Sequence, residues 1–261
     1  MAENIDRKQG PAALVHYKRM ALLTLLGVLH AHLLWFGDVL FSYALAGMLV
    51  YRARHQSVGF LLIGALSLLL LSSIVMLILG WTLPYWAAED LQEMQEYWLP
   101  SAESVRQELI ANSGSWLDQS AQRHAAALEA HQYIIFYLPR IVGLMMVGMA
   151  LFKLDFFGLA YPNKRLLVIG LIALAVSLAI IVVGIQKNFS YHWHLEVLFI
   201  GSQFNYWGSL LMAYAYMCFL VVFCRAQHGQ WIKRALACVG RMSLTNYLAQ
   251  SLICGFIFYG W

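Results

Sequence analysis

Long apolar runs divide the sequence and limit what the chain can fold into. An α-helix rises about 1.5 Å per residue, so roughly 20 apolar residues cross a hydrocarbon core about 30 Å thick. Within lipid a helix satisfies its own peptide groups, whereas the alternating segments of about ten residues typical of a transmembrane β-barrel are absent from this sequence. The runs therefore predict an all-α, polytopic transmembrane bundle of about seven helices. They cover residues 21–36, 38–51, 58–83, 133–151, 166–185, 198–223 and 236–259.

The low charge content agrees with a membrane domain. Only 11% of the residues are charged and 61% are hydrophobic, whereas soluble domains carry about 25% charged residues. We interpret residues 1–261 as one membrane domain, with the first helices in 20–86, an extracytoplasmic loop in 87–130 and four further helices in 131–261. The net charge of +4 is assigned to loops that face anionic lipid, so the predicted partner is the lipid bilayer and not a nucleic acid.

The distribution of lysine and arginine predicts the orientation. With the N terminus in the cytoplasm, thirteen of the 17 basic residues lie in cytoplasmic segments, and Arg106, Arg123 and Lys187 lie outside. The remaining one, Arg140, falls inside an apolar run. The run 38–51 is short for a full crossing, and one span more or fewer would reverse the later loops. The cytoplasmic residues are Arg7, Lys8, Lys18, Arg19, Arg52, Arg54, Lys153, Lys164, Arg165, Arg225, Lys233, Arg234 and Arg241.

The segment 87–130 is the largest polar stretch between apolar runs. Eight of the 13 acidic residues fall in it, with Trp98, Leu99, Ile110 and Trp116 between them. This pattern is typical of short amphipathic helices that rest on the outer face of a membrane. Two interpretations stay open, namely a solvated cap or a lid over an outward-facing acceptor site.

Ionisable residues inside the apolar runs point to a functional site. By helical rise, His30 lies about 13 Å into the bilayer and Arg140 about 10 Å. A charge at that depth costs about 3 kcal/mol on insertion scales, so we predict that Asp38 pairs with Arg140, either functionally or as a purely architectural pair. His32 lies about 200° around the helix from His30. Because both cannot face one cavity, we favour His30, which shares a side with Gly27.

Further polar residues reach the same half of the membrane. Asn246, with Thr245, lies about 15 Å along the last run, and Asn205 lies near the outer end of its own run. These residues are candidates for substrate binding. His192 and His194 are two residues apart, a spacing that brings side chains together on a strand but not on a helix, so no metal site is predicted.

Three blocks of the sequence have a recognisable pattern: "YKRMALLTLLGVLHAHLLWFGDVLFSYALAGMLVYRAR", "PRIVGLMMVGMALFKLDFF" and "VGRMSLTNYLAQSLICGFIFYG". They resemble the YeiB-like bacterial inner-membrane proteins, a family named for a domain of unknown function (number 418). That family is similar to the transmembrane acyltransferases, which move an acyl group from a cytoplasmic carrier to an extracytoplasmic acceptor, often a sugar. The resemblance implies a multi-pass protein of the bacterial inner membrane.

The resemblance also implies roles for individual residues. His30 is expected to act as a general base or orienting group, and Arg140 with Asn246 to bind the carrier or stabilise an oxyanion. Together with Asp38, His30 and Arg140 form the catalytic candidates, while an acyl carrier such as acyl-CoA and a carbohydrate-like acceptor are the implied partners. The substrate-binding candidates are Tyr43, Asn205, Thr245, Asn246 and Gln250. The matching motif positions are His30, Gly37, Asp38, Tyr43, Arg140, Gly240, Arg241, Thr245, Asn246 and Gln250.

Two family features are not found in the sequence, an opening helix with "LDxLRG" and a closing "GPLEWLWR" block. We therefore expect a chain truncated at both ends, with a laterally open cavity and no acyl transfer of its own. Three functions stay open: an acyltransferase, a transporter or flippase for a small or amphiphilic molecule, and a structural fragment without chemistry. The lack of inverted repeats argues against the transporter.

The charge distribution predicts that a cysteine placed at Ser115, in the acidic loop, reacts with a membrane-impermeant maleimide in intact cells. The measurement is mass-tag labelling of Ser115→Cys before and after permeabilisation. Labelling that requires permeabilisation would reverse the orientation.

Overall fold

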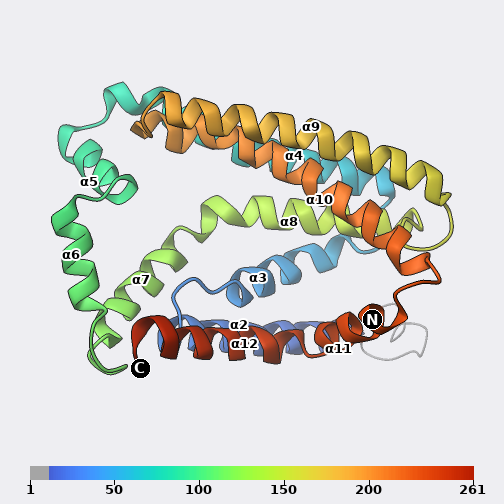
Figure 1. The fold of residues 1–261 in the computed structure, drawn as a ribbon, viewed down its shortest axis with the longest axis horizontal. Coiled ribbons are helices and arrows are strands. Elements are labelled where there is room, and N and C mark those ends of the chain that lie inside the picture. Colours follow the sequence, from blue (N-terminus) through green and yellow to red (C-terminus); the bar gives the residue numbers. More distant parts are fainter. Residues whose placement is uncertain (1–11) are drawn as a thin grey trace. The chain divides into compact units, whose positions relative to one another are not determined.

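The computed structural model describes residues 12–261, and regular structure in this range is helical, which confirms the predicted all-α class. The predicted cytoplasmic residues Arg7 and Lys8 lie outside the described residues. The helices, shown in Figure 1, are α2 (Ala12–Leu33), α3 (Leu40–Val50), α4 (Val58–Thr82), α5 (Ala88–Trp98), α6 (Ala102–Ala111), α7 (Ser120–Gln132), α8 (Ile134–Lys153), α9 (Asn163–Ser190), α10 (Ser202–Arg225), α11 (Gln230–Arg241) and α12 (Ser243–Cys254).

The helices group into two compact units that alternate along the sequence. Among the described residues, the first unit contains 12–69, 106–150 and 242–261, and the second contains 70–105 and 151–241. The predicted division of a single membrane domain around the loop 87–130 stays a prediction. Of the candidate site residues, Asn205 belongs to the second unit, and the first unit holds His30, Asp38, Tyr43, Arg140, Thr245, Asn246 and Gln250.

In the first unit, α2 and α3 pack closely as a hairpin. A Cβ atom on Gly27 would lie 2.4 Å from the backbone N of Phe41 and 2.8 Å from Oδ2 of Asp38. Only a residue without a side chain permits this approach, which is the usual role of glycine between membrane helices. The hairpin therefore holds the connecting segment, with Asp38, directly against α2.

A separate core in the same unit joins the beginning of α4 to α8. Leu61 and Ala65 of α4 are buried against Met146 and Ala150 of α8. Gly143 fits this contact, because a Cβ atom there would lie 3.1 Å from the Ala65 carbonyl oxygen. Small residues thus set the distance between α4 and α8, as they commonly do between membrane helices.

The second unit is built on the long pair α9 and α10. Glycines of each helix face large side chains of the other: Gly184 lies against Phe204, and Gly208 against Ile181. At one end of this unit Leu83, Leu195 and Phe199 form a core. Hydrogen bonds inside the unit join Ser73 to Gln203 (2.6 Å) and Trp207 to Ser73 (3.2 Å), and Trp98 donates to the Trp193 carbonyl (2.9 Å).

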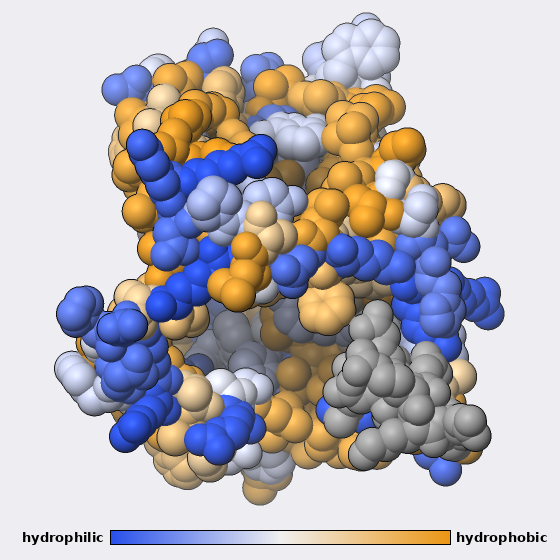
Figure 2. All heavy atoms as spheres, turned by 90° about the vertical axis from the view of Figure 1, so that its right-hand side faces the viewer, coloured by the Kyte–Doolittle hydropathy of each residue, from blue (hydrophilic) through white to orange (hydrophobic). Residues whose placement is uncertain are grey.

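Five helical segments among the described residues are long and apolar enough to cross a membrane. Many of their large apolar side chains are exposed, and Figure 2 shows apolar side chains over much of the visible face. Such a surface suits lipid and not water, which agrees with a membrane protein. The five segments are Ala12–Leu33, Val58–Tyr85, Ile134–Lys153, Asn163–Ser190 and Val197–Arg225.

The remaining two predicted runs are helical but shorter. The second run, 38–51, overlaps Leu40–Ala53, which is a shorter apolar helix. The seventh is divided at Met242 between α11 and α12, followed by a π-helical turn over Gly255–Tyr259. α11 combines Lys233 and Arg234 with exposed apolar residues, a composition typical of a helix at the membrane interface.

Substitution of Gly27 tests the hairpin. We expect Gly27→Ala to lower the free energy of unfolding by about 1–3 kcal/mol, because the new methyl group collides with the backbone of α3. Gly148→Ala in α8 is the matched control, since a Cβ atom there has open space, and alanine is favoured over glycine in a helix by about 0.5–1 kcal/mol. Thermal unfolding of both variants in one detergent measures the difference. Equal stability of the two variants would contradict the close approach.

Candidate functional site

The candidate site begins where α2 ends. His30 lies in the last turn of α2 and is 2% exposed. Its carbonyl oxygen accepts hydrogen bonds from the backbone N–H groups of Leu34 (2.9 Å) and Trp35 (3.0 Å). These two hydrogen bonds hold the residues that follow α2 against its last turn. The chain then passes through Gly37 and Asp38 to α3. The histidine is therefore fixed in the first unit by both its backbone and its burial.

Asp38 connects this turn to the start of α3. Its Oδ2 accepts a hydrogen bond from the backbone N–H of Phe41 at 2.8 Å. The first N–H groups of a helix lack partners within the helix, and an aspartate before the helix commonly supplies one. The other carboxylate oxygen, Oδ1, is thereby directed toward His30.

His30 and Asp38 form a buried pair. Nδ1 of His30 lies 3.0 Å from Oδ1 of Asp38, and each side chain is 1% exposed. The contact is short but lacks the alignment of a regular hydrogen bond, because Nδ1 has no partner of that geometry. A carboxylate at this distance favours the tautomer with its proton on Nδ1.

A serine from the other end of the sequence completes the arrangement. Nε2 of His30 lies 2.8 Å from Oγ of Ser251, a residue of α12 that follows 221 positions later. Tyr247, one turn earlier on α12, stacks obliquely on the His30 ring at 4.8 Å between centroids. Its hydroxyl donates to Asp38 Oδ1 at 3.4 Å and accepts from the backbone N–H of Val39 at 3.3 Å. α12 is thus joined to both His30 and Asp38.

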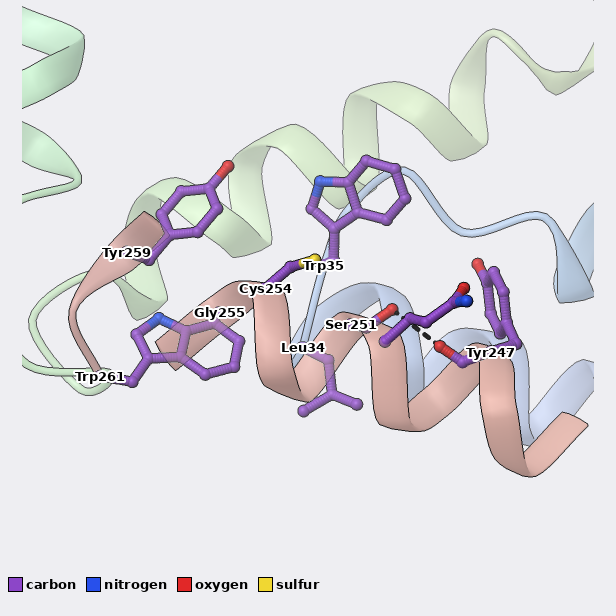
Figure 3. Close-up of a pocket in the computed structure, with 9 residues that line it drawn as sticks. Leu34, Trp35, Tyr247, Ser251, Cys254, Gly255, Tyr259 and Trp261 are labelled. Atoms are coloured by element: carbon purple, nitrogen blue, oxygen red, sulfur yellow. Dashed lines mark hydrogen bonds between the residues drawn. The ribbon is translucent and has the colours of Figure 1, made fainter. Parts of the chain in front are cut away.

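Ser251 also faces a cavity of about 260 Å³ (Figure 3). The walls are mainly apolar and aromatic, and the tyrosine of the site is part of them. In Figure 3 the rings of Tyr259 and Trp261 lie at the end away from Tyr247, and the ring of Trp35 lies between the two ends. The lining residues are Leu34, Trp35, Tyr247, Gln250, Ser251, Cys254, Gly255, Tyr259 and Trp261.

Residues of the predicted loop 87–130 contribute to the walls of this region. Gln119, which is 2% exposed, donates from Nε2 to the Tyr259 carbonyl at 2.9 Å and accepts from Trp261 Nε1 at 2.8 Å. Arg123 donates to the carbonyl of His32 at 3.0 Å and to that of Trp116 at 3.2 Å. Burial lowers the pKa of Arg123, although an arginine stays charged at neutral pH. Residues 112–123 are therefore a fixed part of the first unit.

The structure separates the two histidines of α2. Nδ1 of His32 lies 3.4 Å from Nδ1 of His124, and the His32 ring also contacts that of His131, both on α7. His30 instead lies between Asp38 and Ser251. The prediction that the two rings face different surroundings is consistent with this geometry. Within residues 12–261, no group of three or more His, Cys, Asp or Glu side chains is arranged to hold a metal ion.

The other predicted site residues are distributed more widely. Gln250 lines the cavity, whereas Tyr43 and Thr245 are exposed and Asn246 is half-buried. Asn205 is exposed on α10 of the second unit. Arg140 is half-buried on α8, next to the internal Pro139. Its pairing with Asp38 stays a prediction, since the ion pair that the structure gives Asp38 is with His30.

Sequence reasoning missed Ser251 and Tyr247. The available signal was their spacing of four residues inside the apolar block "SLTNYLAQSLIC", which places a hydroxyl and a phenol on one face of a helix. That face was not connected to His30, because nothing in the sequence links positions so far apart.

The long apolar helices, with a buried histidine and aspartate and a half-buried serine in one unit, define the class as an α-helical protein with membrane-type helices and a polar site. Residues 151–261 match the family "Protein of unknown function (DUF418)". The chain is 28% identical over 253 residues to "Uncharacterized protein YeiB" of Escherichia coli (strain K12), covering 92% of this chain. It is also 28% identical over 268 residues to "Uncharacterized protein YxaH" of Bacillus subtilis (strain 168), covering 99% of this chain.

These matches agree with the resemblance seen in the sequence to the YeiB-like proteins. The chain spans 62% of the length of each of these two relatives. No solved structure matches the chain.

Proposed function

We propose, in place of the expectation that the chain has no acyl transfer of its own, that the protein is a transmembrane acyltransferase that uses His30, held by Asp38, as the general base. The observation that carries the proposal is the position of a hydroxyl oxygen 2.8 Å from Nε2 of His30, with a carboxylate 3.0 Å from Nδ1. A base within about 2.6–3.2 Å of a hydroxyl is positioned to remove its proton as that oxygen attacks a carbonyl carbon. A carboxylate on the far side stabilises the imidazolium that forms.

The burial of this pair strengthens the proposal. Buried ionisable residues inside membrane helices are costly, and they commonly mark functional sites. A purely structural role would be served by a well-packed apolar pair at lower cost, because breaking or desolvating an ion pair is unfavourable. His30 and Asp38 do not line the cavity themselves, but each contacts a residue of α12 that does: His30 contacts Ser251, and Asp38 contacts Tyr247.

The cavity indicates the chemical nature of the group transferred. Its apolar and aromatic walls suit the hydrocarbon part of an acyl group, whose burial is favourable by about 0.8 kcal/mol per methylene. A volume of about 260 Å³ lies below the range of roughly 300–1,000 Å³ for drug-sized ligands. The cavity therefore favours a short acyl group over a long fatty-acyl chain.

The donor and acceptor follow from this chemistry. An acyl thioester such as acyl-CoA is an activated donor that needs no metal, and a hydroxyl or amine, as on a carbohydrate, is the acceptor that a general base activates. In this scheme the predicted topology brings the thioester from the cytoplasm and the acceptor from the outer face. Arg140, Asn246 and Gln250 are the candidates to bind the carrier or the developing oxyanion.

The test is thiol release from acyl-CoA by membrane vesicles that contain the full chain, with glucosamine as the acceptor. We expect His30→Gln to slow release by about 10²–10⁴-fold, the usual contribution of a general base. His32→Gln, two residues away in the same helix, is the matched control and should keep the rate. The donors acetyl-, butyryl-, hexanoyl- and octanoyl-CoA should be used with falling efficiency.

The proposal is contradicted if no donor is consumed, or if His30→Gln and His32→Gln have equal rates. Uptake of acceptor without acyl transfer would instead favour a transporter. Thermal unfolding of both variants distinguishes loss of chemistry from loss of the fold.

A further inference from the structure

We propose that Ser251 is a covalent carrier, which takes the acyl group from the donor and passes it to the acceptor. The inference deepens the proposed acyl transfer and rests on it for the identity of the group carried. The underlying claim that His30 activates Ser251 can be tested without any acyl donor.

The side chains are arranged in the order that activates a serine. Asp38 Oδ1 lies 3.0 Å from His30 Nδ1, and His30 Nε2 lies 2.8 Å from Ser251 Oγ. With the proton on Nδ1 beside the carboxylate, the lone pair of Nε2 is directed at the serine hydroxyl. A nucleophile within hydrogen-bond reach of a base, which a third group orients, is the general signature of covalent catalysis.

The position of Ser251 also argues against a bystander role. Ser251 lies between the buried imidazole and the cavity, because it contacts His30 and lines the cavity as well. A substrate hydroxyl that enters the cavity therefore meets Oγ of Ser251 before it can reach Nε2 of His30. Direct deprotonation of the acceptor by His30 becomes possible once Ser251 is acylated and no longer donates its proton to the ring.

The neighbours of Ser251 hold it in this orientation. Its Oγ can donate to the Tyr247 carbonyl at 3.3 Å in the preceding turn of α12, a contact drawn in Figure 3, or to Nε2 of His30, which lies closer at 2.8 Å. The Tyr247 hydroxyl is in turn bonded to Asp38. Gln250, the residue before the serine, lines the cavity with a side chain that carries amide N–H donors. Such donors stabilise the oxyanion of a tetrahedral intermediate.

The reaction balances in two steps. In the first, Oγ of Ser251 attacks the thioester carbonyl carbon, His30 takes the serine proton, the carbon–sulfur bond breaks, and His30 returns the proton to the leaving thiolate. In the second, the acceptor hydroxyl attacks the serine ester, His30 takes its proton, the bond to Oγ breaks, and Ser251 regains a proton from His30. No oxidant, reductant or metal is required.

The experiment treats the full chain in membranes with a fluorophosphonate probe, which forms a phosphorus–oxygen bond to an activated serine and releases fluoride. Peptide mass spectrometry locates the label. We expect modification of Ser251 and not of Ser243, which lies on the same helix. Labelling should fall at least 100-fold in His30→Gln and persist in His32→Gln. Absence of label on Ser251 in the folded protein, or labelling that is equal in the two histidine variants, would overturn the inference.

A second measurement separates this inference from the proposed function. Acetyl-CoA is supplied without an acceptor, and the peptide that contains Ser251 is weighed. We expect an added acetyl group that is lost when glucosamine is supplied, and loss of transfer in Ser251→Ala. His30-dependent transfer that continues in folded Ser251→Ala, without acyl-serine, would overturn the carrier role and leave the acyltransferase intact. Probe labelling of Ser251 without consumption of any acyl-CoA would support the activated serine and contradict the proposed function.

Discussion

The contact between His30 and Asp38 is the interaction on which the first unit depends. One carboxylate oxygen caps the start of α3 through Phe41, and the other lies against the imidazole at the end of α2. α12 then joins this pair through Tyr247 and Ser251. In a medium without water, an unpaired carboxylate costs far more than an unpaired surface group. Three helices are therefore held together by the requirement that one buried charge be satisfied.

The need to satisfy buried polar groups also explains why part of the acidic loop is held in the first unit. Gln119 and Arg123, both buried, bond to carbonyl groups at the ends of the membrane helices, which have no partners within their own helices. These contacts position Tyr259 and Trp261, which are walls of the cavity. The part of the loop near α7 is thus neither a freely solvated cap nor an independent element. Whether it opens as a lid stays a prediction.

The sequence predicts much of the fold, because the length of each apolar run and the free-energy cost of unpaired peptide groups in lipid allow few structures other than helices. It also identifies His30 and Asp38, since ionisable residues in apolar runs are rare. The contact between His30 and Ser251 was beyond reach, because the two residues are 221 positions apart and only the folded chain brings them together. The break at Met242 was missed, although the polar residues Arg241 and Ser243 flank it, because the apolar residues on either side were assigned to one continuous run. Helical rise places Arg140 near the depth of His30, but depth along a helix does not determine which helices are neighbours, so the pairing of Arg140 with Asp38 stays a prediction.

The protonation of the His30 ring tests the central claim most directly. Nitrogen-15 NMR of histidine-labelled protein, with the His30 signals assigned by their loss in His30→Gln, distinguishes the two neutral forms of the ring. The account predicts a proton on Nδ1, beside Asp38, and a bare Nε2 that accepts from Ser251. A proton on Nε2 and a bare Nδ1 would contradict it, because His30 would then donate to Ser251 and have no lone pair with which to activate it.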